Sequence, residues 1–172
     1  YIPTAESIEA VKKDITFLSE CTGTETEGQA LVTNIDTAIK DIKEKAAGIT
    51  DKKTVYFELG AAPQLYSCGS DTFINEIITL VGGENIYASE SGWLSNSEET
   101  VIAANPDVII TSVMYDGYDF NEIKNRAGWD SIKAVKDGYI YQVNPNYVSR
   151  PSQNVIKGIY EVAKAIYPEV YQ

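Results

Sequence analysis

Histidine is missing from this 172-residue sequence. Its absence removes the side chain that proteins use most often as a metal ligand and as a general base. Only Asp, Glu or Lys is left to activate a nucleophile. The sequence also lacks a G-x-S-x-G elbow, a P-loop and a G-x-G-x-x-G dinucleotide fingerprint. We therefore expect no catalytic residue, no bound metal ion and no cofactor, and we interpret the protein as a non-enzyme.

Long apolar runs and excess positive charge are missing too. No stretch stays apolar long enough to cross a membrane, and no signal-peptide pattern is present. The net charge of -11 argues against nucleic acid and anionic membrane surfaces as partners and mildly disfavours a strongly anionic ligand. The chain begins Tyr1-Ile2-Pro3 without methionine, so we expect a fragment or a processed form of a longer protein.

Cysteine is scarce, with Cys21 and Cys68 far apart in the sequence and in different expected elements. The pair is compatible with one disulfide or with two free thiols. We favour the interpretation that both are small buried hydrophobic residues. Two cysteines alone make a metal site improbable.

The length fits one domain, or one lobe with an extension. The most informative stretch is residues 93–111. Ser97 is a good N-cap, and the charges of Glu98 and Glu99 oppose the positive helix end, each contributing about 0.3–1 kcal/mol. Asn105-Pro106 ends the helix because a residue before proline avoids helical dihedrals. Residues 108–110 are apolar and β-branched, which is typical of a buried parallel strand.

Apolar periodicity predicts the other elements. Two helices are expected first, over residues 4–20 and 25–47, with glycines near their ends. Residues 66–70, 112–118 and 144–150 are expected to be loops. The alternation of strands and helices predicts an α/β fold, a three-layer α/β/α arrangement with a mainly parallel central sheet. We expect strands over residues 54–59, 86–87, 108–110 and 139–143, and helices over residues 71–81, 98–104, 119–125, 130–135 and 152–167.

Aromatic side chains gather in the loops expected at the carboxyl ends of the strands, where open α/β sheets bind ligands. Rings with a polar tip suit a large, flat, partly apolar ligand. An arginine adds a planar fork suited to a carboxylate or phosphate. The alternatives are a packed or incidental aromatic and, for the arginine, a surface salt bridge or a cap on carbonyl groups. The candidate ligand-binding residues are Tyr66, Trp93, Tyr115, Tyr118, Tyr147 and Arg150.

Three segments carry a resemblance to a known family. The first runs from Trp93 through Ser97-Glu98-Glu99 and Asn105-Pro106-Asp107 into an apolar strand. The second runs from Phe57-Glu58 to Gly83-Glu84-Asn85-Ile86. The third runs from Ser149-Arg150-Pro151-Ser152 through Gly158 to Tyr167-Pro168-Glu169. In their order and spacing, over most of the chain, they resemble the second lobe of ABC-importer substrate-binding proteins with a rigid helical backbone. That class binds cobalamin, haem and ferric siderophores.

The resemblance implies a division of the chain. Residues 1–24 would be the helical end of an N-terminal lobe, residues 25–50 the connecting backbone helix, and residues 51–172 the C-terminal α/β ligand-binding lobe. An ordinary two-helix hairpin explains the periodicity of the first two segments equally well. The family holds its ligand between two lobes, so if nothing precedes Tyr1, half of the site is absent and self-association is expected to cover exposed apolar surface.

The resemblance also implies a function: the extracytoplasmic substrate-binding component of an ABC importer, with or without a lipid anchor. It would capture a corrinoid or metal chelate and deliver it to the membrane permease. Trp93 and Tyr147 stand where the family places aromatic residues against its ligand, and Tyr66 lies in the first ligand loop. Glu99, in register in the S-x-E motif, corresponds to a glutamate that docks onto permease arginines; the alternative is that it only stabilises its helix.

The identity of the ligand stays open at this point. The acidic charge and the single arginine near the site slightly favour cobalamin or haem over an anionic ferric siderophore, and Tyr66 is the best axial ligand for haem iron. Two rival functions remain: a cell-surface protein-interaction module that uses the tyrosine-rich rim, and an α/β enzyme. A flat tyrosine-rich patch with no groove would favour the module, and a loop-edge pocket with no titratable cluster would count against the enzyme.

Overall fold

The central sheet has four parallel strands in the order β3-β1-β5-β6 in the computed structural model, which describes residues 3–172. Val55 pairs with Val108 between the two central strands, and Ile109 pairs with Ile140 at the next boundary. The expected parallel sheet is therefore confirmed. Its strands are β1 (Thr54–Glu58), β3 (Glu84–Asn85), β5 (Val108–Thr111) and β6 (Ile140–Gln142).

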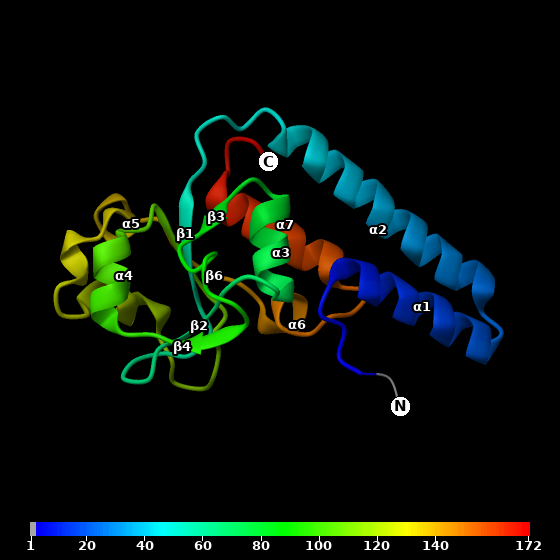
Figure 1. The fold of residues 1–172 in the computed structure, drawn as a ribbon, viewed down its shortest axis with the longest axis horizontal. Helices are drawn as coiled ribbons and strands as arrows, with labels where there is room; N and C mark the ends of the chain where they lie inside the picture. Colours follow the sequence, from blue (N-terminus) through cyan, green and yellow to red (C-terminus); the bar gives the residue numbers. More distant parts are fainter. Residues whose placement is uncertain (1–2) are drawn as a thin grey trace.

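Successive side chains of the central strands point to opposite faces of the sheet. Phe57 and Ile110 enter the core beneath α3 and α7, whereas Tyr56 and Ile109 enter the core on the other face. Figure 1 shows α3 and α7 on one side of β1, with α4 and α5 on the other. The predicted three-layer arrangement is confirmed. The covering helices are α3 (Phe73–Leu80), α4 (Glu98–Ala104), α5 (Lys133–Asp137) and α7 (Val155–Ile166).

A helical hairpin projects from this α/β unit (Figure 1). It consists of α1 (Ile8–Thr22) and α2 (Glu25–Ala46). Ser7 caps α1 by accepting a hydrogen bond from the Ala10 N–H, so the helix begins later than the predicted residue 4. The bounds of α2 match the prediction to within one residue. Tyr1, at which the first predicted unit begins, lies outside the described residues.

The segment from Ser97 to β5 follows the sequence prediction closely. Ser97 Oγ accepts a hydrogen bond from the Thr100 N–H at 3.3 Å, which fixes the start of α4. Asn105 ends the helix in the left-handed conformation with φ 48°. Asp107 then joins the neighbouring strand by accepting hydrogen bonds from the Thr54 N–H and hydroxyl at 2.8 and 2.9 Å. The capped helix therefore delivers β5 into the centre of the sheet.

The loop predicted over residues 66–70 is partly wrong. Here β2 (Tyr66–Cys68) pairs antiparallel with β4 (Trp93–Ser95). Ser67 Oγ also donates a hydrogen bond to the Phe57 carbonyl at 2.7 Å, which ties this ribbon to β1. Such three-residue strands are too short to show a period of two, and their pairing joins segments distant in the sequence.

Two other short segments differ from prediction. The strand predicted at residues 86–87 is assigned to residues 84–85, although the Ile86 N–H still donates to the Val55 carbonyl at 3.0 Å. The loop predicted over residues 144–150 contains α6 (Pro145–Val148), because Asn144 Oδ1 accepts a hydrogen bond from the Asn146 N–H and proline occupies the first helical turn.

The region between β5 and β6 holds short helices, as predicted, but their division differs. Residues 119–125 form the 3₁₀ helix η1 (Phe120–Asn125). The single helix predicted over residues 130–135 is replaced by η2 (Trp129–Ser131) and α5. Ile132 separates them because its backbone is extended, with φ -71° and ψ 134°.

Both cysteines are free thiols. Cys68 is buried, as interpreted, whereas Cys21 is exposed, so the interpretation of two buried residues is wrong for Cys21. Position explains the difference, because Cys21 lies in the last turn of α1 at the projecting end of the hairpin. Within residues 3–172, no helix is long and apolar enough to span a bilayer.

Candidate ligand-binding site

The carboxyl edge of the sheet is built by the loops that follow β1, β5 and β6 and by the β2–β4 ribbon. The ribbon is held there by the Leu59 N–H, which donates to the Tyr66 carbonyl at 2.8 Å. The side chains of Tyr66 and Trp93 remain 39% and 52% exposed on it. The ribbon therefore presents two of the candidate aromatic rings to solvent beside the ends of the parallel strands.

Trp93 borders a hollow of about 210 Å³. Phe73 lines it from α3, Pro151 from the segment after α6, and Glu6 from the N-terminal segment. The structure thus brings Trp93 close to residues 148–151, the stretch that also carries Arg150. The edge is hollowed here, which differs from the flat patch expected of a protein-interaction module.

Tyr115 and Tyr118 form a pair in the loop after β5. Their ring centroids are 5.1 Å apart and the rings are tilted by 40°. Tyr115 is 62% exposed, whereas the Tyr118 hydroxyl points inward and donates to Glu58 Oε1 at 3.3 Å. Burial and the neighbouring Glu58 charge raise the pKa of Tyr118 to about 12.

Tyr147 and Arg150 lie on and just after α6. The Lys157 ammonium lies 5.1 Å from the centroid of the half-buried Tyr147 ring. Arg150 is exposed, and within residues 3–172 its side chain forms none of the ion pairs found. Its guanidinium is therefore available to an anionic group of a ligand.

Sequence reasoning missed a buried ion pair at this same edge. Glu58 ends β1 with a fully buried side chain, and Arg126 Nη1 and Nη2 contact its two carboxylate oxygens at 2.5 and 3.1 Å. Nη2 also contacts Glu122 at 2.7 Å, and the guanidinium lies 4.6 Å from the centroid of the Trp129 ring. Burial raises the pKa of Glu58, and Arg126 opposes that rise. The signal that was available is a carboxylate at the end of an otherwise apolar strand.

The ion pair bears on the enzyme alternative. It is a titratable cluster at the loop edge, but the Glu58 carboxylate is inaccessible to solvent and both of its oxygens are occupied by Arg126. Within residues 3–172, no group of three His, Cys, Asp or Glu side chains is placed to hold a metal ion. Tyr66, Trp93, Tyr115 and Arg150 are exposed at this edge, an arrangement that suits binding of a ligand with flat apolar parts.

Glu99 lies apart from the aromatic rings, in the first turn of α4. It is exposed, and hydrogen bonds from its own N–H and the Ser97 hydroxyl lower its pKa. Glu98 instead accepts a hydrogen bond from Trp129 Nε1 at 2.8 Å, so its carboxylate has a structural role. Glu99 borders an open groove of about 440 Å³ with apolar walls from Leu65 and Ile102.

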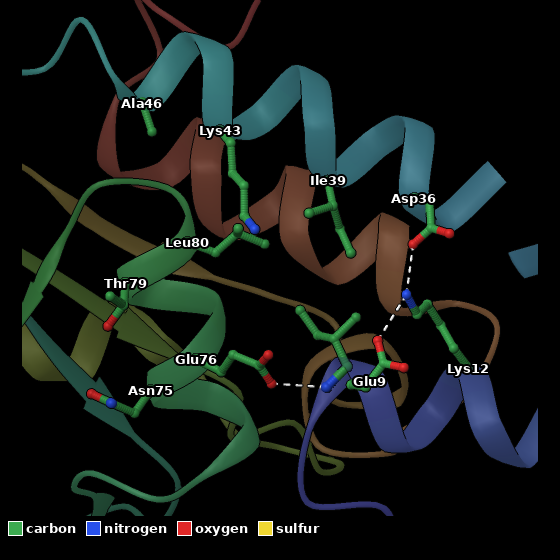
Figure 2. Close-up of a pocket in the computed structure, with 11 residues that line it drawn as sticks. Glu9, Lys12, Asp36, Ile39, Lys43, Ala46, Asn75, Glu76, Thr79 and Leu80 are labelled. Carbon is green, nitrogen blue, oxygen red and sulfur yellow. Dashed lines mark hydrogen bonds and ion pairs between the residues drawn. The ribbon is translucent and has the colours of Figure 1, made fainter. Parts of the chain in front are cut away.

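Another hollow, about 670 Å³, contains none of the candidate residues. Figure 2 shows it between α1, α2 and α3. Lys12 bridges Glu9 and Asp36 at 2.8 and 2.7 Å, and Glu76 accepts a hydrogen bond from the Ile8 N–H at 2.8 Å (Figure 2). The Lys12 bridge joins α1 to α2, and the Glu76 bond joins the start of α1 to α3, which explains these polar groups without a ligand.

Comparisons with known proteins match most of the chain to one family. The family model described as "Periplasmic binding protein" matches residues 2–147. An uncharacterised ABC transporter substrate-binding lipoprotein of Bacillus subtilis is 35% identical over 98% of the chain. A vitamin B12-binding protein of Vibrio campbellii is 26% identical over 95% of the chain. The crystal structure of a possible iron-binding, periplasmic solute-binding protein of Staphylococcus epidermidis superposes on 97% of the chain with a TM-score of 0.86 at 30% identity.

These relatives are longer than the chain described here. The match spans 53% of the Bacillus protein and 58% of the Vibrio protein. It spans 65% of the Staphylococcus structure. The chain therefore corresponds to a part of each relative.

Proposed function

We propose that this chain, which belongs to the periplasmic binding protein family, serves as the C-terminal lobe and connecting helix of a substrate-binding component of an ABC importer. Members of the family are binding proteins. The proposed location is outside the cytoplasm, in the periplasm or on the cell surface, as the lipoprotein relative suggests.

The proposed division of the chain follows the two structural parts. Residues 1–24 would end a first lobe, residues 25–50 would connect the lobes, and residues 51–172 would form the second lobe. The 22 residues of α2 span roughly 33 Å at 1.5 Å per residue, enough to hold the first lobe clear of the sheet in the second. Phe17, Leu18 and Leu31 are 41–53% exposed on the projecting hairpin, which suits a surface that another lobe or a second copy covers.

The proposed ligand is a corrinoid, haem or ferric siderophore held at the carboxyl edge. The carrying observation is that Tyr66, Trp93 and Tyr115 expose their rings at this edge, where Arg150 is also exposed. Aromatic rings with polar tips suit a large ligand with flat apolar parts. The vitamin B12-binding relative and the possible iron-binding structure support this class. The Tyr118 hydroxyl is already bonded to Glu58, whereas Tyr66 is exposed and remains the candidate ligand for haem iron.

An absorbance-monitored titration tests this proposal. Vitamin B12, haem and a ferric siderophore are titrated separately into this chain and into a longer form that includes the upstream lobe. Saturable binding of one of them to the longer form supports the proposal, and tighter binding by the longer form supports the division into lobes. Silence from both forms with all three ligands contradicts it and makes the protein-interaction module the leading function.

Glu99 is the proposed contact with the membrane permease. Its carboxylate is exposed, charged and free of the hydrogen bond that occupies Glu98, so it suits an arginine of the permease. Glu99→Ala should lower uptake by cells while the Kd for the ligand stays unchanged. Glu84→Ala, at the amino end of β3, removes another exposed carboxylate and should leave uptake intact. Weaker ligand binding by Glu99→Ala would contradict this assignment.

A further inference from the structure

The buried pair of Glu58 and Arg126 stands at the loop edge, where the Arg126 guanidinium lies against the buried Trp129 ring. Glu58 is the last residue of β1, and its side chain is fully buried. A buried ion pair is weak evidence for stability, since apolar residues of similar size often serve as well. Its location among the candidate ligand loops therefore calls for another explanation.

A chain of contacts links this pair to an exposed ring. Arg126 fixes both oxygens of Glu58, and Oε1 also accepts the hydrogen bond from the Tyr118 hydroxyl. The Tyr118 ring lies against Tyr115, whose own side chain is 62% exposed. Both tyrosines belong to residues 112–119, which contain no helix or strand of their own. The Tyr118 hydroxyl thus ties the far end of this loop to the Glu58 carboxylate, while the Ser112 N–H ties its start to the Glu58 carbonyl at 3.0 Å.

We propose that Glu58 and Arg126 are positioning residues that act through Tyr118 to order residues 112–119 before a ligand arrives. The ligand in this inference rests on the proposed function. The ordering of the loop rests only on the contacts described above. A loop ordered in advance binds more tightly, because less side-chain freedom is lost on binding. Arg126 holds Glu58 in one rotamer, and Glu58 in turn offers a fixed acceptor to Tyr118.

Hydrogen–deuterium exchange of the unliganded protein tests the ordering. Tyr118→Phe removes only the hydroxyl, and amide exchange in residues 112–119 should become at least about threefold faster. Tyr160→Phe is the matched control, because it removes a similar bond of 3.2 Å to Asp41 on α2, and it should leave this loop unchanged. Loop exchange equal to that of the wild type in Tyr118→Phe overturns the proposal.

A double variant separates positioning from stability. Glu58→Leu combined with Arg126→Met replaces both charges by apolar groups, so no charge is left unpaired. The loop should again exchange about threefold faster, while exchange of the central strands stays as in the wild type. Unchanged loop exchange in a folded double variant overturns the role of the pair. If the double variant fails to fold, Tyr118→Phe still decides the proposal.

Titration of the same variants with vitamin B12, haem and a ferric siderophore separates this inference from the proposed function. Where the wild type binds one of them, Tyr118→Phe should raise the Kd roughly three- to tenfold, the effect of one or two more side chains to be ordered. An unchanged Kd despite faster loop exchange overturns the positioning role. If the wild type binds none of the three, the proposed function fails, while the exchange result still decides whether the pair orders the loop.

Discussion

Replacing Arg126 by methionine keeps an apolar stem of similar shape but leaves the Glu58 carboxylate buried without its partner. The two side chains are 6% and 0% exposed and meet at 2.5 and 3.1 Å. Two unit charges about 4 Å apart interact by about 4 kcal/mol at an effective dielectric constant of ~20. This agrees with the ~3–5 kcal/mol cost of removing one partner of a buried pair. We expect Arg126→Met to lower the free energy of unfolding by that amount at pH 8.

The loss should depend on pH in a defined direction. Burial raises the pKa of Glu58, and Arg126 opposes the rise, so the pKa should rise further when Arg126 is removed. When the pKa of a carboxyl group is higher in the folded than in the unfolded protein, the folded protein becomes less stable as the pH rises through the folded pKa. The deficit of Arg126→Met should therefore be largest at pH 8 and shrink toward pH 5, as Glu58 takes up a proton. Loss of the contact with Trp129 adds about 1 kcal/mol at every pH.

Urea unfolding between pH 5 and 8, followed by tryptophan fluorescence, measures this deficit because Trp129 is fully buried. In the double variant Glu58→Gln with Arg126→Met, no charge is left unpaired, so the pH dependence should disappear and most of the stability should return. Glu122→Gln removes a 46% exposed partner of Arg126 and should cost less than about 1 kcal/mol. A deficit below about 1 kcal/mol for Arg126→Met, or one that grows as the pH falls, would refute the argument.

Three further expectations concern single residues. Burial raises the pKa of Asp107, but the Lys133 ammonium at 2.6 Å and hydrogen bonds from β1 outweigh burial, so the pKa is lowered. Asp107→Asn should therefore lower the free energy of unfolding by about 1–2 kcal/mol in urea at pH 7, and this loss should vanish as the pH falls through the lowered pKa. Cys21 should react with a chromogenic disulfide reagent in the folded protein, whereas Cys68 should react only on unfolding, because burial raises its pKa to about 12; two fast thiols would contradict this. Gly158→Ala should lower the midpoint of thermal unfolding by several degrees, at a cost of about 1–3 kcal/mol, because the added Cβ would lie 2.5 Å from a carbonyl oxygen of α6.

The elements that sequence patterns predicted well are those determined by local chemistry. Ser97 caps α4 and Asn105 ends it, so the helix has the bounds that its own residues dictate. All four residues of β5 are buried, as expected for a continuous apolar strand that is covered on both faces of the sheet. In both cases the information lies within a few residues of the element, and distant partners only confirm it.

The elements that sequence patterns missed depend on distant partners. The β2–β4 ribbon exists because Tyr66 meets Ser95 across the chain, and neither three-residue segment shows alternation by itself. The short helix α6 depends on its cap at Asn144, which resembles an ordinary turn signal in the sequence. Segments of three or four residues carry too little pattern to compete with the structure around them.

The pair of Glu58 and Arg126 shows why composition alone misjudges the charge of the site. The sequence pattern indicates Arg150 as the single arginine near the site and gives no signal for Arg126. In the fold, the Arg126 side chain is 6% exposed and neutralises Glu58. Arg150 is exposed and takes part in none of the ion pairs found within residues 3–172. The buried pair therefore adds almost no net charge to the carboxyl edge. The charge that an incoming ligand meets at this edge is therefore determined by exposed side chains such as Arg150 and Asp116, and the buried pair contributes little to it.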